Sequence, residues 1–398
     1  MLHEAWVIDA VRTPIGKYGK SLAGVRPDDL GAHVLKALMQ RTGIAPKEVE
    51  DVYFGCANQA GEDNRNVARM VLLLAGFPEE VAGCTVNRLC GSGLEAVVEA
   101  ARAIMVGEAH VYVAGGVESM SRAPWVIPRA ERAFPRGNLT GYDTALGWRL
   151  TNPKMIELGH TDSLGQTAEN LAEMYRIPRE AQDRFALHSH QKAIRATDAG
   201  RFRDEIMPIE TADGVVEVDE CPRRDTSLEK LATLKPAFKK DGTVTAGNSS
   251  PLNDGAAALL LVSAEYGRAH GLKPLAKIRA SAVAGVPPRI MGIGPVPATK
   301  KVLERAGLSL SEIDLIELNE AFAAQSLAVL HDLQIDPEDP RLNPNGGAIA
   351  LGHPLGCSGA RIATTLLHEL KRHGDKQFGL ATMCIGVGQG ISVVFEKV

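Results

Sequence analysis

The chain has 398 residues, of which 45% are hydrophobic and 23% are charged, and its formal net charge is −4. This length exceeds what one hydrophobic core usually organises, so we expect two or three domains. The negative net charge argues against a nucleic-acid partner. Apolar runs stay shorter than a membrane-spanning helix, which argues against a membrane protein.

The cysteines indicate a reducing compartment. They are Cys56, Cys84, Cys90, Cys221, Cys357 and Cys384. Their scattered spacing fits neither a disulfide framework nor a zinc site. The first residues do not form the basic and then apolar segment that directs export. We therefore expect free thiols, no bound metal and a cytoplasmic location.

The first third of the chain alternates between strand and helix signals. Residues 6–10 and 52–54 are short apolar runs, and 111–114 is another. Between the first two, apolar residues recur at helical spacing from 30 to 38, and this pattern stops at Gly43. Such alternation predicts an α/β fold with a mostly parallel sheet covered by helices.

Residues 122–246 break this alternation. They carry dispersed prolines, many charges and two helical stretches at 167–175 and 179–200. We interpret them as a polar insertion, after which the apolar run 256–262 returns to the core. The predicted domains are 1–121, 122–246, 247–274 (a return to the N-terminal half) and 275–398.

An internal repeat is legible in the sequence. Residues 43–52 resemble 307–316, and the glycine-flanked serine in 91–93 resembles 357–359. A helix, a glycine and a strand recur in many α/β proteins. The similarity nevertheless favours two similar α/β halves.

Cys90 lies in the segment NRLCGSG at 87–93, and apolar residues at helical spacing follow from Leu94. This pattern places the sulfur at the start of a helix, where free N–H groups and the helix dipole favour a thiolate. The flanking glycines let a reacting group approach the backbone. The alternative is a small core residue at a tight turn.

Three further clusters lie in the C-terminal third. Asn319 follows an apolar run, His353 stands in the glycine-rich loop 345–356, and Cys384 precedes the glycines of 386–390. Each residue alone also fits a structural role. Together they supply a nucleophile, a base, a second thiol and an amide, which is the set that nucleophilic catalysis needs.

These clusters identify a family resemblance. The chain resembles a thiolase (acyl-CoA:acetyl-CoA C-acyltransferase) over essentially its whole length. The motifs that carry the resemblance, in the order of the family, are 87–93, 115–121, 319–323, 346–356 and 384–390. One departure is Val387, which stands where many family members carry glycine.

Within the family, three stretches are most similar to 3-oxoadipyl-CoA thiolases. They are residues 55–66, 147–149 and 225–229. The resemblance implies the thiolase fold, in which two similar α/β halves form a five-layered αβαβα core with an inserted loop domain that binds CoA. It also implies a homodimer or a homotetramer and no cofactor beyond the substrates CoA and acyl-CoA.

The resemblance implies a role for each clustered residue. Cys90 would take the acyl group as a thioester after activation by His353. Cys384 would act as acid and base on the acetyl-CoA carbon. The N–H groups of Cys90 and Gly386 would form one oxyanion pocket, and His353 with a water held by Asn319 the other. Fixed donors of this kind are worth roughly 3–4 kcal/mol each to an oxyanion.

The same resemblance implies a CoA site. Its residues would be Ser250, Phe238, Leu164, Arg223 and Phe322. Arg223 and its neighbour Arg224 would face the nucleotide phosphates, although paired arginines are also common on solvated faces. The implied reaction is degradative: CoA cleaves a 3-oxoacyl-CoA to acetyl-CoA and a shortened acyl-CoA. For 3-oxoadipyl-CoA the second product would be succinyl-CoA.

Other functions remain as alternatives. A general acetoacetyl-CoA thiolase is one, but Ser163 stands where those enzymes usually carry histidine. A 3-oxoacyl synthase shares the fold, but it pairs its cysteine with two histidines or His and Asn and has no equivalent of Cys384. A non-catalytic acyl-CoA carrier and a metal enzyme are further alternatives, and no ligand spacing supports the last.

A 3-oxoadipyl chain ends in a carboxylate, and its recognition needs a cation. Arginine forms paired hydrogen bonds with carboxylates. The candidates in or near the stretches similar to 3-oxoadipyl-CoA thiolases are Arg65, Arg149 and Arg129. Each of them also fits a role in folding or in subunit contacts.

Overall fold

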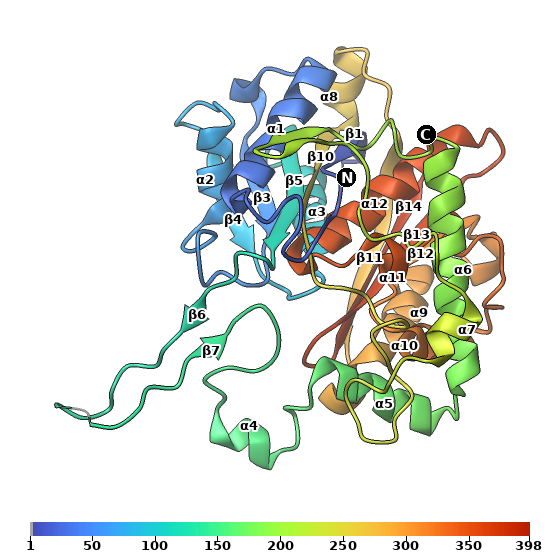
Figure 1. Cartoon of the computed structure of the whole chain (residues 1–398). Helices are drawn as coiled ribbons and strands as arrows, with labels where there is room; N and C mark the ends of the chain where they lie inside the picture. Colours follow the sequence, from blue (N-terminus) through green and yellow to red (C-terminus); the bar gives the residue numbers. More distant parts are fainter. Residues whose placement is uncertain (1–2, 135) are drawn as a thin grey trace.

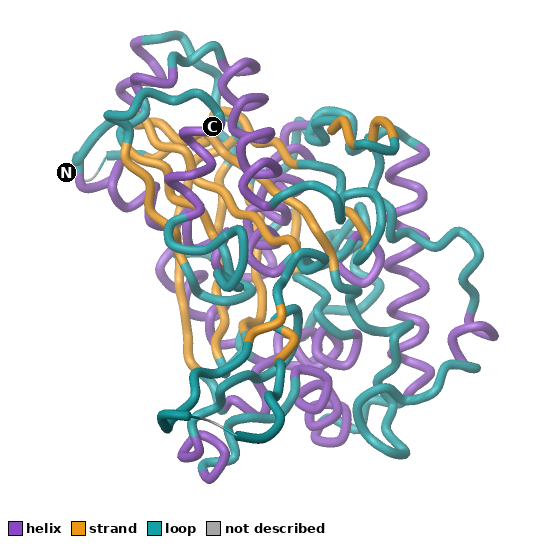
Figure 2. The backbone as a smooth tube through the Cα atoms, turned by 60° about the vertical axis from the view of Figure 1, so that its left-hand side comes forward, coloured by secondary structure: helices purple, strands orange, loops and turns teal. Residues whose placement is uncertain are grey.

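The computed structural model describes residues 3–134 and 136–398. Its core is a ten-stranded sheet with the order β12-β13-β14-β11-β1-β10-β5-β3-β4, to which β2 adds beside β10. The first half supplies β1 (Ala5–Arg12), β2 (Gly16–Lys17), β3 (Asp51–Gly55), β4 (Ala82–Val86), β5 (Val111–Ser119) and β10 (Asn253–Ser263). The second half supplies β11 (Ala276–Gly285), β12 (Leu315–Leu318), β13 (Phe378–Ile385) and β14 (Gln389–Glu396). Figure 2 shows long strands running side by side with helices packed around them.

The sheet is mixed, so the prediction of a mostly parallel sheet is wrong. Only the pairs β3–β4, β3–β5 and β12–β13 within the described sheet are parallel. The strand β10 returns from the inserted segment antiparallel to β5 and β1. The strands β13 and β14 are joined by a short hairpin, which forces them to run antiparallel. The alternation of strand and helix therefore holds only in parts of each half.

Helices divide the molecule into five layers. The helices α3 (Ser92–Val106) and α12 (Leu355–Arg372) pack against each other between the two halves of the sheet. The outer layers are α1 (Pro27–Thr42) with α2 (Val67–Leu74), and α9 (Pro295–Ala306) with α10 (Ala323–Leu333). Figure 1 shows α12 passing through the middle of the fold. The five-layered α/β fold implied by the resemblance is confirmed.

Glycines allow the two central helices to touch through their backbones. A Cβ atom at Gly93 would lie 2.7 Å from the carbonyl oxygen of Gly356, and one at Gly359 would lie 2.3 Å from the nitrogen of Leu94. On β5, a Cβ at Gly116 would lie 2.1 Å from the same oxygen of Gly356. No larger residue fits these places without moving backbone. The beginnings of α3 and α12 are therefore held side by side.

The repeat between 43–52 and 307–316 is confirmed. The helices α1 and α9 each end at a glycine with φ of 69°, Gly43 and Gly307. A short 3-10 turn follows each of them, η1 (Pro46–Glu48) and η3 (Leu310–Glu312), before β3 and β12. The second repeat is displaced: Ser92 opens α3, whereas residues 357–359 lie inside α12.

Both helical stretches of the inserted segment are confirmed as α5 (Leu164–Met174) and α6 (Arg179–Asp198). The remaining elements are α4 (Pro153–Glu157), α7 (Leu228–Ala232), α8 (Ala264–Ala269), η2 (Pro288–Ile293), α11 (Ala348–Leu351), and the pairs β6 (Trp125–Val126) with β7 (Tyr142–Asp143) and β8 (Ile209–Thr211) with β9 (Gly214–Val216). The arm that carries β6 and β7 extends away from the body (Figure 1). The domain bounds stay a prediction. Within 3–134 and 136–398, every helix is too short or too polar to cross a membrane.

Candidate active site

Cys90 lies directly before Gly91, the residue that caps α3, so its placement at a helix start is confirmed. Its side chain is 7% exposed and lines a cavity of about 450 Å³. Burial raises the pKa of the thiol to about 11, although the backbone N–H groups of Gly386 and of Cys90 itself act in the opposite direction. The expectation of a thiolate at rest is therefore wrong, because desolvation outweighs the helix start.

The hydrogen bonds of His353 determine which ring nitrogen carries its proton. The backbone N–H of His353 donates to Asn253 Oδ1 at 2.8 Å, and its Nδ1 lies 2.6 Å from Ser358 Oγ. The hydroxyl of Ser358 donates to the carbonyl oxygen of Pro354 at 2.9 Å. Since that proton is committed, Nδ1–H of His353 must donate to Ser358. The Nε2 atom is left with a lone pair, as a base requires.

Burial and the nearby charge of Arg361 lower the pKa of His353 to about 3. The imidazole is therefore neutral at neutral pH, and so is the Cys90 thiol. A neutral imidazole can take a proton from a neutral thiol when a substrate arrives. The resting site holds no buried ion pair at these two residues, and it avoids the cost of one.

Asn319 and Cys384 face the same region from the second half of the sheet. The side chain of Asn319 is fully buried, and its Nδ2 lies 3.5 Å from His353 Nε2. Its Oδ1 has no hydrogen-bond partner among residues 3–134 and 136–398. Cys384, at the end of β13, is 1% exposed. Burial and then the neighbouring Cys90 raise the pKa of its thiol. The two sulfur atoms are thus electrostatic neighbours.

The hairpin turn between β13 and β14 presents Gly386 to Cys90. Val387 follows in the left-handed region with φ of 63°, where a β-branched residue is strained. This conformation gives a physical reason for glycine at that position in many family members. Gly388 approaches the backbone of Val286 so closely that a Cβ would lie 2.2 Å from its oxygen. The turn is held there because the N–H of Val286 donates to Gly388 at 2.8 Å.

Most of the residues expected to bind CoA gather beside Cys384. Leu164 and Phe322 pack in one apolar cluster with Cys384. The rings of Phe238 and Phe322 form an edge-to-face pair with centroids 5.9 Å apart. The N–H of Ser250 donates to the residue before Phe322, Ala321, at 3.0 Å.

Arg223 lies elsewhere, on the wall of a smaller cavity of about 150 Å³. Ser249 and Pro251 line that cavity too, so Ser250 connects it with the aromatic pair. The neighbouring Arg224 pairs on the surface with Asp198. The structure therefore brings four of the five expected CoA residues together, whereas Arg223 lies on the neighbouring, smaller cavity.

Of the three candidate arginines, Arg149 lines the large cavity. Arg65 and Arg129 are exposed and do not line it. Ser163, the residue that replaces a family histidine, also lines the cavity, and its hydroxyl caps α5 by accepting from Gln166 N–H. A polar cap explains a serine at this position.

Sequence reasoning missed the role of Glu118, although it noted the surrounding motif 115–121. The buried carboxylate accepts N–H bonds from Ala57 at 3.0 Å, Asn58 at 3.1 Å and Gly356 at 2.8 Å. It thereby ties the loop after β3 to the start of α12. Burial raises the pKa of Glu118 to about 7.

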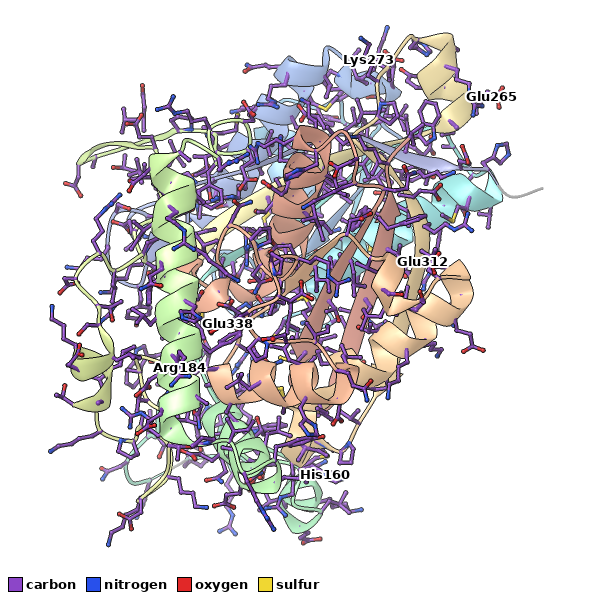
Figure 3. The ribbon with its side chains drawn as sticks, turned by 90° about the vertical axis from the view of Figure 1, so that its right-hand side faces the viewer. His160, Arg184, Glu265, Lys273, Glu312 and Glu338 are labelled. Carbon is purple, nitrogen blue, oxygen red and sulfur yellow. The ribbon has the colours of Figure 1, made fainter. Side chains whose placement is uncertain are left out.

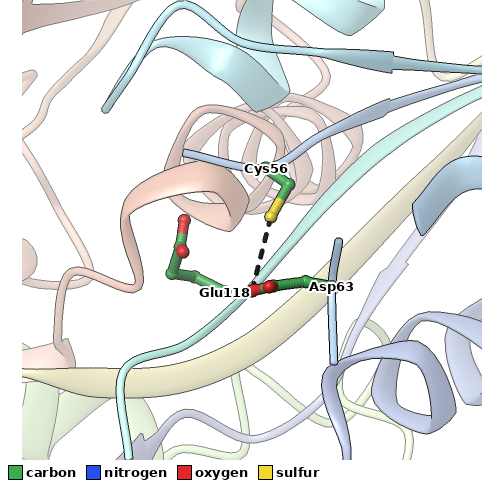
Figure 4. Close-up of side chains that lie close together, drawn as sticks. All are labelled: Cys56, Asp63 and Glu118. Atoms are coloured by element: carbon green, nitrogen blue, oxygen red, sulfur yellow. Dashed lines mark hydrogen bonds between the residues drawn. The ribbon is translucent and has the colours of Figure 1, made fainter. Parts of the chain in front are cut away.

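Glu118 also belongs to a group with Cys56 and Asp63, whose possible ligand atoms lie within 4.8 Å of one another (Figure 4). The Cys56 thiol lies 3.8 Å from Asp63 Oδ2. Burial and then the charge of Glu118 raise the pKa of Cys56 well above its usual value. A protonated thiol and a carboxylate already occupied by three N–H groups make a poor metal site.

Comparisons with known proteins give a consistent result. The family described as "Thiolase, N-terminal domain" matches residues 5–265, and "Thiolase, C-terminal domain" matches 272–397. The chain is 56% identical to the beta-ketoadipyl-CoA thiolase of Pseudomonas aeruginosa, with 100% of each chain covered. It is 54% identical to the 3-oxoadipyl-CoA/3-oxo-5,6-dehydrosuberyl-CoA thiolase of Escherichia coli K12, again with 100% of each covered. The crystal structure of human mitochondrial 3-ketoacyl-CoA thiolase in complex with CoA superimposes with a TM-score of 0.93 at 43% identity, covering 100% of this chain and 98% of that one.

Ser358→Ala removes the hydroxyl that accepts from His353 Nδ1–H. We expect Cys90 to react with iodoacetamide about tenfold more slowly in this variant, because a buried imidazole loses a hydrogen bond worth roughly 1–3 kcal/mol. The rate is followed by mass spectrometry of the peptide that contains Cys90. The exposed Cys84 in the same sample is the internal control. Ser358→Thr keeps a hydroxyl and should retain most of the reactivity, and an unchanged Cys90 rate in Ser358→Ala would contradict the assignment.

Proposed function

This chain belongs to the thiolase family, and on that premise we propose that its cavity cleaves 3-oxoacyl-CoA with CoA to acetyl-CoA and a shortened acyl-CoA. The protein is an acyl-CoA acyltransferase enzyme. The observation that carries the proposed mechanism is the meeting of Cys90, His353, Asn319 and Cys384 at one place. Cys90 comes from the first half of the chain and the other three residues from the second half. Asn319 Nδ2 lies 3.5 Å from His353 Nε2, and Cys90 is close enough to Cys384 to raise the pKa of its thiol.

In the first half-reaction, Cys90 attacks the 3-oxo carbon of the substrate while His353 Nε2 takes the thiol proton. The backbone N–H groups of Cys90 and Gly386, which favour negative charge at the sulfur, hold the oxyanion that forms. The bond between C2 and C3 then breaks with its electron pair on C2. Cys384 gives a proton to that carbon, which releases acetyl-CoA and leaves an acyl thioester on Cys90.

The leaving group passes through an enolate of acetyl-CoA, and its oxygen needs donors of its own. Asn319 and His353 supply this second pocket. Asn319 Oδ1 is buried and has no hydrogen-bond partner in the part of the chain that the structure describes, which supports a bound water there, since such an atom rarely stays without a partner.

The second half-reaction restores the enzyme. The thiol of CoA gives its proton to the Cys384 thiolate and attacks the acyl thioester. The bond to Cys90 breaks, the shortened acyl-CoA leaves, and the protonated His353 returns the proton to Cys90. Every proton is thus accounted for within these three side chains. No cofactor other than the substrate CoA takes part in this proposal.

The proposed substrate is 3-oxoadipyl-CoA, which gives succinyl-CoA and acetyl-CoA. Two relatives that match over their full length carry names of dicarboxylic acyl chains, adipyl and suberyl. Two of the stretches similar to 3-oxoadipyl-CoA thiolases also line the large cavity, 55–66 through Ala57 and Asn58, and 147–149 throughout. Two of the three stretches that carry the likeness therefore line the space proposed for the acyl chain.

The division of work between the two thiols can be tested by Cys90→Ala and Cys384→Ala. We expect both changes to lower thiolysis by about 10³-fold or more, because each removes a group that acts directly in the reaction. Cys384→Ala should still be acylated at Cys90 by an acyl-CoA, as seen by mass spectrometry of the intact protein. Near-normal turnover in Cys90→Ala would refute the mechanism. Parallel loss of acylation and thiolysis in Cys384→Ala would refute the separate role of that residue.

The substrate is tested by comparing kcat/KM for 3-oxoadipyl-CoA and for 3-oxohexanoyl-CoA, which has the same length without the charge. We expect the diacid to be preferred by about 10- to 100-fold, the value of one good charged hydrogen-bond pair. Equal or better cleavage of the uncharged chain would indicate a general degradative thiolase.

A homodimer or a homotetramer in the cytoplasm is proposed as the working form. The strand β4 is an edge of the sheet and offers unpaired backbone groups to a second copy. The arm with β6 and β7 exposes Trp125, Phe134 and Leu139. The six free cysteines suit a reducing compartment. Light scattering of the purified protein should give two or four times the chain mass of 42.5 kDa, and a monomer would contradict this.

A further inference from the structure

We propose that Arg149, with His160 on the same wall, forms a subsite of the active-site cavity that binds the terminal carboxylate of the acyl chain. This inference rests on the proposed function and specifies how the enzyme distinguishes a dicarboxylic chain from a plain one. It assigns specificity to two side chains that take no part in bond breaking.

The charges around the cavity point to Arg149. Among residues 3–134 and 136–398, it is the one Lys or Arg side chain that lines this cavity. It is half-buried and makes no ion pair with a described carboxylate. The acidic residue on the same wall, Asp162, is already engaged by Arg289 at 3.2 Å and by Asn170 at 2.9 Å. A partly desolvated guanidinium without an anion is costly, and a substrate carboxylate would compensate that cost.

The guanidinium is held in place by the loop after β3. Its Nη2 donates to Asn58 Oδ1 at 2.7 Å. The amide of Asn58 donates in turn to the carbonyl of Thr144 at 3.0 Å and to its hydroxyl at 3.2 Å. These hydrogen bonds engage Nη2 of Arg149 and restrain its guanidinium group. A fixed fork loses little entropy when it binds a carboxylate.

The backbone around Arg149 is also fixed. Gly147 and Leu150 both have positive φ, 83° and 49°, so the segment turns sharply on each side of Trp148 and Arg149. The indole N–H of Trp148 donates to the carbonyl of Asp162 at 3.2 Å and fastens this turn to the segment before α5. A left-handed leucine is strained, and such strain persists only where surrounding contacts maintain it.

His160 comes from that same segment, between α4 and α5 (Figure 3). It lines the cavity and is only partly exposed. An imidazole N–H can donate to a carboxylate oxygen that enters the cavity. The pair thus offers the carboxylate a charged fork and a second donor.

The rest of the wall suits the methylene part of an acyl chain. Its apolar members include Leu89, Leu146, Met291, Leu355 and Val387. Cys90 and Gly386 mark the reacting end of this space. A chain with a thioester at one end, apolar carbons in the middle and a carboxylate at the other end matches this distribution of groups.

The test compares Arg149→Gln, Arg149→Lys and His160→Gln with the wild type and with Arg129→Gln, an exposed arginine outside the cavity. The measured quantity is the ratio of kcat/KM for 3-oxoadipyl-CoA to that for 3-oxohexanoyl-CoA. We expect the ratio to fall to about one in Arg149→Gln and to an intermediate value in Arg149→Lys. In His160→Gln it should fall by about fivefold. In each variant the change should come mainly from a higher KM for 3-oxoadipyl-CoA. Arg129→Gln should keep the wild-type ratio. A wild-type ratio in Arg149→Gln would overturn the subsite.

A binding experiment separates this inference from the proposed function. In the Cys90→Ala background, which cannot form an acyl-enzyme, calorimetry gives Kd for succinyl-CoA and for butyryl-CoA. We expect tighter binding of succinyl-CoA, and adding Arg149→Gln should remove that preference. Loss of the preference together with absent thiolysis in the wild type would support the subsite and refute the proposed reaction. Equal binding of the two ligands with normal thiolysis would refute the subsite alone.

Discussion

The structure depends on the contact between α3 and α12, in which the first turns of two helices meet backbone to backbone. Gly93 and Gly359 supply the contact, and Gly116 lets β5 approach the same point. The backbones come so close that the loops preceding both helices lie side by side. Cys90 ends one of those loops, and His353 stands in the other. Glycine destabilises a helix by about 1 kcal/mol relative to alanine. Burial of the apolar side chains around these glycines offsets that loss.

This contact also explains the electrostatics of the site. A centre so enclosed is poorly hydrated, so burial pushes the pKa of Cys90 up and that of His353 down. Both groups rest neutral, and charge appears only when a substrate enters. Backbone N–H groups are suitable partners for that charge, because they carry fixed dipoles that need no proton and little reorganisation. Glu118 stabilises the same centre indirectly, because its carboxylate accepts a hydrogen bond from the N–H of Gly356 at the start of α12.

Much of this could be predicted from the sequence where a pattern is local. The helix after Cys90, the glycine that ends α1 and the two helices of the inserted segment all follow from spacing and capping residues. The motifs also named the reacting residues. The direction of β10 could not be predicted, because it pairs with β1 and β5, which lie far from it in the sequence.

Non-local effects set the rest of the site. A helix start predicts a thiolate at Cys90, but desolvation by the whole fold prevails. The role of Ser358 depends on where its own proton goes, which no spacing reveals. Among the three arginines, only the fold decides that Arg149 reaches the cavity.

The position of β14 has a consequence for synthesis of the protein. This strand comes last in the chain, yet it lies between β13 and β11 inside the sheet. A ribosome must therefore add residue 396 before the sheet can close, and Cys384 and Gly386 can reach Cys90 only then. Nascent chains hold an intact Cys90 segment throughout this time but no assembled centre. A chain cut short by a few tens of nucleotides would leave an open sheet with exposed strand edges, the kind of surface that chaperones and proteases recognise.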